Sequence, residues 1–194
     1  MVPPLGLQQL LAWASRPMLA SRFGITLTYW PPRHFRAAKC NGVPFTRQEP
    51  GLTGTPLGPA LSTIYLAAAV RDNGAGRVIS TEPNAPKVAQ ARANIAEAGL
   101  ADWVTILEGD ALETFADLPG PVEFVLLDGW KNLYLPVLHQ LEPRLVPGAL
   151  VLADDSISLA AQMADYLAYV RDPGHGYVSV EFPDGDGLEI SCRA

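Results

Sequence analysis

The sequence predicts a doubly wound α/β domain, in which helices cover both faces of a mostly parallel sheet. From about residue 60 onward, unbroken apolar runs of strand length alternate with helical patterns and short turns. Such runs are typical of strands buried on both faces. The chain then closes with two alternating stretches joined by the turn "PDGDG", which predicts an antiparallel strand near the C-terminus. With 194 residues, the chain is long enough for one domain with a substantial core.

Each element follows from its local pattern. The apolar runs predict four buried strands, and the helical segments between them show a 3.6-residue period and end near Gly or Pro. Strands are expected at 77–82, 103–110, 122–128 and 148–155, followed by the antiparallel pair 176–182 and 188–193; helices are expected at 85–100, 132–145 and 158–172.

The first 59 residues have a different character. A helix is expected at 6–20, and the segment after it is rich in Pro and Gly and has no clear period of 2 or 3.6. We therefore expect residues 60–194 to form the ordered α/β body, with much of 28–58 mobile or irregular. Residues 1–59 are treated as an N-terminal extension of a single domain.

Composition excludes several classes. The chain is 48% hydrophobic and 18% charged, which is typical of a globular protein. A net charge of −6 disfavours nucleic acid as a partner. No apolar run reaches the ~18 residues of a membrane helix, and without a basic n-region a signal peptide is not expected. Cys40 and Cys192 fit neither a metal motif nor a disulfide framework, so a reducing cytoplasm is the expected location.

Acidic residues follow four of the predicted strands. They are Glu82, Asp110, Asp128 and the pair Asp154-Asp155. Ligands of open α/β sheets bind outside the carboxyl ends of the strands, so four acids along one edge indicate a binding site. For each acid taken alone, a helix cap or turn residue remains the alternative.

These acids suggest specific chemistry. The Glu82 carboxylate can accept both hydroxyls of a ribose, and Asp110 can accept the exocyclic amine of an adenine while the backbone of Ala111 meets a ring nitrogen. The three acids of the last two strand ends could bind one hard cation such as Mg²⁺, which prefers oxygen ligands. They are Asp128, Asp154 and Asp155.

Several segments carry a family resemblance. The stretches "LSTIYLAAAVRDNGAGRVISTE", "ILEGDALE", "VLLDGWKNLYLP" and "GALVLADD" resemble the class I S-adenosylmethionine-dependent O-methyltransferases. The segment "LDGWKNLYLP", together with "LVLADD" and "DYLAYVR", is most similar to the catechol O-methyltransferases. The resemblance covers residues 61 to about 194.

The resemblance implies roles for particular residues. Lys131 would be the base that takes a proton from a substrate hydroxyl, and Trp130 and Asp128 would border the cofactor. Asp128 would also bind the metal, together with Asp154 and Asp155, where the family usually has Asp-Asn. Because methyl transfer is an in-line displacement, such positioning accounts for much of the catalysis. A solvated lysine remains the alternative for Lys131.

The glycine-rich cofactor loop departs from the family pattern. Gly54, Gly58 and Ser62 resemble it and are the candidate cofactor contacts, but two extra residues and two prolines intervene. A second candidate lies upstream at 23–26, in which case 27–61 interrupt the motif, as an insertion or as an artefact of gene reading.

The leading hypothesis is therefore metal-assisted methyl transfer from S-adenosylmethionine to a hydroxyl of a small, catechol-like molecule. The alternative is a non-catalytic methyltransferase fold that binds a nucleoside or a protein. A nucleotide-dependent oxidoreductase is less favoured, because no G-x-G-x-x-G follows a strand.

Overall fold

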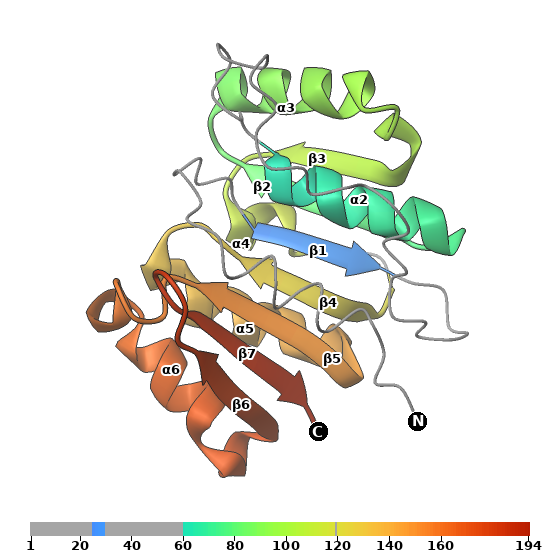
Figure 1. The fold of residues 1–194 in the computed structure, drawn as a ribbon. Coiled ribbons are helices and arrows are strands. Elements are labelled where there is room, and N and C mark those ends of the chain that lie inside the picture. The colour runs from blue at the N-terminus through green and yellow to red at the C-terminus, as the bar shows by residue number, and fades with distance from the viewer. Residues whose placement is uncertain (1–24, 30–59, 119) are drawn as a thin grey trace.

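The computed structural model describes residues 60–118 and 120–194, together with the backbone of 25–29. These residues form a seven-stranded sheet with the order β3-β2-β1-β4-β5-β7-β6 and helices on both faces (Figure 1). The strands are β1 (Ile25–Tyr29), β2 (Arg77–Glu82), β3 (Val104–Glu108), β4 (Val122–Leu127), β5 (Leu145–Asp154), β6 (Tyr177–Phe182) and β7 (Leu188–Arg193). The α-helices are α2 (Leu61–Asn73), α3 (Ala85–Glu97), α4 (Ala111–Thr114), α5 (Tyr134–Leu141) and α6 (Ala164–Arg171).

The sheet is mostly parallel in strand direction. Strands β2 and β3 pair in parallel, as do β4 and β5, while β7 is antiparallel to β5 and β6. Strand β1 is antiparallel to both of its neighbours, β2 and β4. Five strands therefore share one direction, namely β2, β3, β4, β5 and β6, and the other two, β1 and β7, run the opposite way. The predicted fold class, including an antiparallel strand near the C-terminus, is confirmed.

Strand β1 is the main departure from the sequence-based prediction, which placed no strand at 25–29. It pairs with β2 and β4 in the middle of the sheet. Its last residue, Tyr29, lies opposite Arg77 and Val122, the first residues of those strands. The sequence did carry a signal, because Ile-Thr-Leu-Thr alternates and is rich in β-branched residues. The rest of the predicted N-terminal extension, including the helix at 6–20, lies outside the described residues.

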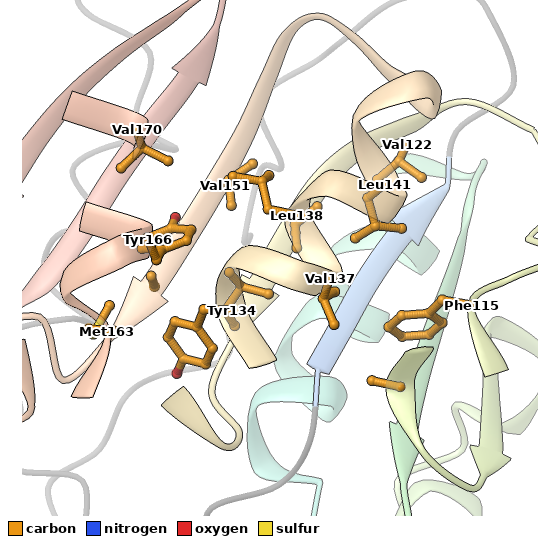
Figure 2. Packing of buried hydrophobic residues seen from close by; sticks show 14 of the residues in the cluster. Phe115, Val122, Tyr134, Val137, Leu138, Leu141, Val151, Met163, Tyr166 and Val170 are labelled. Carbon is orange, nitrogen blue, oxygen red and sulfur yellow. The ribbon is translucent and has the colours of Figure 1, made fainter. Parts of the chain in front are cut away.

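Two layers of helices cover the described sheet. Helices α4, α5 and α6 lie on one face, where Figure 2 shows side chains of α5 and α6 packed against strand residues. Helices α2 and α3 cover β2 and β3 on the other face. The first cluster includes Ala111, Leu138, Tyr166, Val125 and Val151; the second includes Ala67, Val88, Val78 and Ile106. Each large side chain buried here stabilises the fold by about 1.5–3 kcal/mol.

Two predicted helices are shorter than expected. The segment 132–145 contains α5 flanked by the 3-10 turns Lys131–Leu133 and Glu142–Arg144. The segment 158–172 becomes helical only at α6, after the 3-10 turn Ala160–Gln162. Ile157 and Ser158 donate their backbone N–H groups to the carbonyl of Asp186, a loop contact that competes with an earlier helix start. Further 3-10 turns are Ala101–Trp103 and Pro173–His175.

None of the helices in the described part of the chain is long and apolar enough to cross a membrane.

Candidate functional site

Four of the parallel strands end at one edge of the sheet. Glu82 is paired with Glu108 across β2 and β3, and Leu127 is paired with Ala153 across β4 and β5. Asp128 and Asp154, one residue further along their strands, therefore follow neighbouring strand ends. The edge expected from the sequence exists, and it gathers the acids that the sequence placed there.

Lys131 lies among these acids. It belongs to the 3-10 turn that follows β4, and its side chain is only 2% exposed. Its Nζ atom is 2.8 Å from Oδ2 of Asp155 and donates a hydrogen bond of 2.5 Å to the hydroxyl oxygen of Tyr134. The alternative of a solvated lysine is therefore wrong: the ammonium group is buried and faces the acids.

The backbone at the end of β5 places Asp155 in this arrangement. Asp155 is one of two described residues other than glycine with a positive φ, 65°. This left-handed conformation costs a non-glycine residue roughly 1–3 kcal/mol and is found mainly where the surroundings enforce it. The ion pair with Lys131 is one such constraint, so local strain and the buried charge pair occur at the same residue.

Asp128 and Asp154 form a second pair in the cluster. Burial raises the pKa of Asp128 well above its ordinary value, the nearby Asp154 raises this pKa further, and Lys131 partly opposes the shift. The pKa of Asp154 is also raised, by burial and then by Asp155. The two carboxyl groups are hydrogen-bonded to each other, so the pair holds a proton more tightly than separate, solvated carboxylates would.

The predicted three-acid metal centre does not form in this arrangement. Within residues 60–118 and 120–194, no three His, Cys, Asp or Glu side chains are arranged to hold a metal ion. The oxygen donors have the chemistry that Mg²⁺ prefers. However, Asp155 is directed toward Lys131, whereas Asp128 and Asp154 are directed toward each other. The arrangement therefore does not by itself bring the three acids together, and the shared cation stays a prediction.

Glu82 is well placed for the predicted ribose contact. It is only 4% exposed, and its Oε1 atom accepts the backbone N–H of Asn84 at 2.9 Å. The N-cap of α3 is Asn84, whose side chain accepts the N–H of Lys87. Asn84, not Glu82, caps the helix, so the capping alternative for Glu82 is wrong; its role toward a ligand stays a prediction.

The other predicted cofactor residues are less enclosed. Asp110 is the N-cap of α4, accepting the N–H of Leu112 at 2.8 Å, so the capping interpretation describes it; Ala111 follows it in the helix. Trp130 is 74% exposed. Ser62 is buried in the first turn of α2, while Gly54 and Gly58 lie outside the described residues.

Tyr134 is the functional candidate that sequence reasoning left without a role. It is the first residue of α5, it is fully buried, and its hydroxyl contacts Lys131. The signal for this contact was the three-residue spacing between Lys131 and Tyr134, which places both on the same side of a helical turn.

Comparison with known proteins identifies a family for part of the chain. A family model described as a methyltransferase domain matches residues 54–156. A catechol O-methyltransferase of Niastella koreensis is 33% identical over 100 residues, which are 50% of this chain and 44% of that protein. A catechol O-methyltransferase of Sus scrofa is 34% identical over 105 residues, 50% of this chain and 55% of that one. The chain thus spans about half the length of the curated relatives it matches.

Solved structures of methyltransferases share the fold. A Podospora anserina methyltransferase bound to S-adenosylhomocysteine has a TM-score of 0.62 at 18% identity, covering 69% of this chain and 67% of that one. An O-methyltransferase of Streptomyces achromogenes in complex with S-adenosylmethionine has a TM-score of 0.59 at 22% identity, covering 69% and 68%. The chain therefore belongs to the methyltransferase domain family.

Proposed function

We propose that this protein transfers a methyl group from S-adenosylmethionine to a hydroxyl of a small, catechol-like acceptor, with Lys131 taking the hydroxyl proton. The observation that supports this most strongly is the buried Lys131 side chain, 2.8 Å from Asp155 at the carboxyl edge of the sheet. A buried amine at this edge is close to where ligands of such sheets bind.

The reaction has a simple balance of atoms. The acceptor oxygen forms a bond to the methyl carbon while the sulfur–methyl bond breaks, so the sulfonium becomes a neutral thioether. The hydroxyl proton must leave the oxygen, and a neutral Lys131 amine is the proposed acceptor. Because the displacement is in line, holding oxygen, methyl and sulfur in register supplies much of the rate enhancement.

The proposed cofactor would supply the reactive methyl group, and this chain's residues would hold it. Glu82 is the proposed ribose ligand, because its carboxylate is buried at the end of β2 and is not used as a helix cap. Asp110 and Ala111 are proposed at the adenine, with Trp130 beside them. The predicted Mg²⁺ is not part of the proposed steps, because the acids are not arranged to hold it together.

One observation favours a second candidate, a methyltransferase fold without turnover. Family resemblance places the glycine-rich loop directly after a central strand that ends at the same edge as the others. Here β1 runs antiparallel to β2 and β4, so its carboxyl end lies at the opposite edge from Glu82 and Asp128. A central strand in this direction departs from the family pattern, and this departure favours a fold that has lost cofactor binding.

Calorimetric titration of S-adenosylhomocysteine into the purified chain separates the two candidates. Dissociation constants in the micromolar range support the enzyme. If millimolar ligand produces no binding heat while circular dichroism shows an intact fold, the non-catalytic candidate is supported.

A further inference from the structure

The Lys131 amine has a limited set of hydrogen bonds to distribute. A protonated lysine has three N–H donors and no acceptor, whereas the neutral amine required of a base has two N–H donors and one lone pair. One donor faces Asp155 at 2.8 Å and another faces the Tyr134 hydroxyl at 2.5 Å. In the neutral amine these two contacts use both N–H donors, which leaves the lone pair to take the hydroxyl proton.

Tyr134 is anchored by the packing of its ring in the core. Its side chain is fully buried in the main core, where Figure 2 shows it at the base of α5, beside Tyr166. The two rings meet edge to face, with centroids 5.7 Å apart. Lysine, in contrast, has a flexible four-carbon side chain that must be held in one conformation to act repeatedly on the same oxygen.

The position of the two residues in the chain supports a shared role. Lys131 begins the 3-10 turn after β4, and Tyr134 begins α5 immediately after it. The turn therefore brings the lysine side chain back over the phenol oxygen, and the phenol itself is anchored by the packing of α5 against the sheet.

We propose that Tyr134 is a positioning residue, whose hydroxyl holds the Lys131 amine beside Asp155 at the methyl-transfer site. This inference rests on the proposed function for its catalytic consequence. The contact itself does not depend on turnover, so it is tested separately from activity.

The first test is a thermal double-mutant cycle of Tyr134→Phe and Lys131→Met. Phenylalanine keeps the ring and removes only the hydroxyl. If the hydroxyl holds Lys131, Tyr134→Phe should lower the melting temperature by about 2–4 °C more in the lysine background than in the methionine background, the shift expected for one hydrogen bond in a chain of this size. Additive shifts would overturn the proposed contact, and this result requires no enzymatic activity.

The second test measures catalysis with S-adenosylmethionine and catechol. Tyr134→Phe should lower kcat about tenfold and leave the KM for S-adenosylmethionine unchanged, because a less ordered lysine affects the chemical step rather than cofactor binding. Tyr166→Phe is the matched control: Tyr166 is equally buried, and its hydroxyl lies near Ser191 and Glu189. Equal losses of kcat in both variants would assign Tyr134 a purely structural role.

The two tests separate the possible failures. The melting temperatures of Tyr134→Phe and Lys131→Met could be non-additive while kcat of Tyr134→Phe is unchanged. That result would contradict the positioning role and leave the proposed methyl transfer standing. A wild-type protein that binds no S-adenosylhomocysteine would overturn the proposed function and, with it, the catalytic part of this inference.

Discussion

Replacing Glu82 with alanine should weaken cofactor binding by a calculable amount. The carboxylate is buried at the end of β2, and its Oε1 atom is used by the N–H of Asn84. The hydrogen bond from Asn84 is made to Oε1, and Oε2 is the proposed acceptor of a ribose hydroxyl. A hydrogen bond to a charged group contributes roughly 1.5–3 kcal/mol. Its loss should raise the dissociation constant of S-adenosylhomocysteine by about 10- to 150-fold.

Calorimetric titration of S-adenosylhomocysteine into Glu82→Ala and into a control variant measures this change in affinity. The matched control is Glu108→Ala, because Glu108 lies opposite Glu82 on the neighbouring strand but is exposed. That variant should bind the cofactor as the wild type does. Loss of the Asn84 contact can also lower the melting temperature of Glu82→Ala, so affinities are compared at a temperature where both variants are folded. An unchanged affinity for Glu82→Ala would refute the ribose assignment.

Three further predictions follow from the buried charges. The raised pKa of Asp128 means that the folded state holds its proton more tightly than the unfolded state, so the unfolding free energy should fall as pH rises from about 4 toward neutrality. In urea titrations across this range, Asp128→Asn should lose less stability than the wild type; parallel pH profiles would contradict this. Lys131→Met leaves Asp155 without its ammonium partner beside two other acids, so added Mg²⁺ should raise the variant's melting temperature more than that of the wild type. Equal shifts in scanning fluorimetry would argue against charge compensation by Lys131. Arg171→Met should destabilise the fold by about 3 kcal/mol in urea denaturation, because it strips the fully buried Glu189 of its bidentate partner. Arg71→Met, which removes an exposed pair with a sequence neighbour, should cost under about 1 kcal/mol.

Much of the fold could be predicted because the signals are local. The strands 77–82 and 188–193 have the predicted bounds, since apolar runs flanked by turns fix both ends. Tertiary contacts were harder to anticipate. The N–H groups after Asp155 bind the loop around Asp186, which delays the start of α6, and no local pattern signals that partner. Strand β1 had a local signal, but its antiparallel direction is set by its neighbours.

In the candidate site, too, local signals were predictable and tertiary contacts were not. Strand-end position was enough to bring Asp128, Lys131 and Asp155 to one edge, because parallel strands align their carboxyl ends. It could not predict which charges would pair. That outcome depends on the positive φ of Asp155, which directs the carboxylate to Lys131, and on the hydrogen bond between Asp128 and Asp154. Residue type alone predicted one metal centre for the three acids, and it gave no sign that Lys131 would pair with Asp155.

Direct detection of methyl transfer tests the central claim. The purified chain is incubated with S-adenosylmethionine and catechol, and products are identified by mass spectrometry. We expect a mono-O-methylated catechol together with S-adenosylhomocysteine. In Lys131→Met the rate should fall by a factor of about 10²–10⁴, as expected on removal of a general base. Arginine at this position should not restore the rate, because a guanidinium does not release its proton near neutral pH. Methylation at the wild-type rate by Lys131→Met, or no methylated product from a chain that binds the cofactor, would contradict the account.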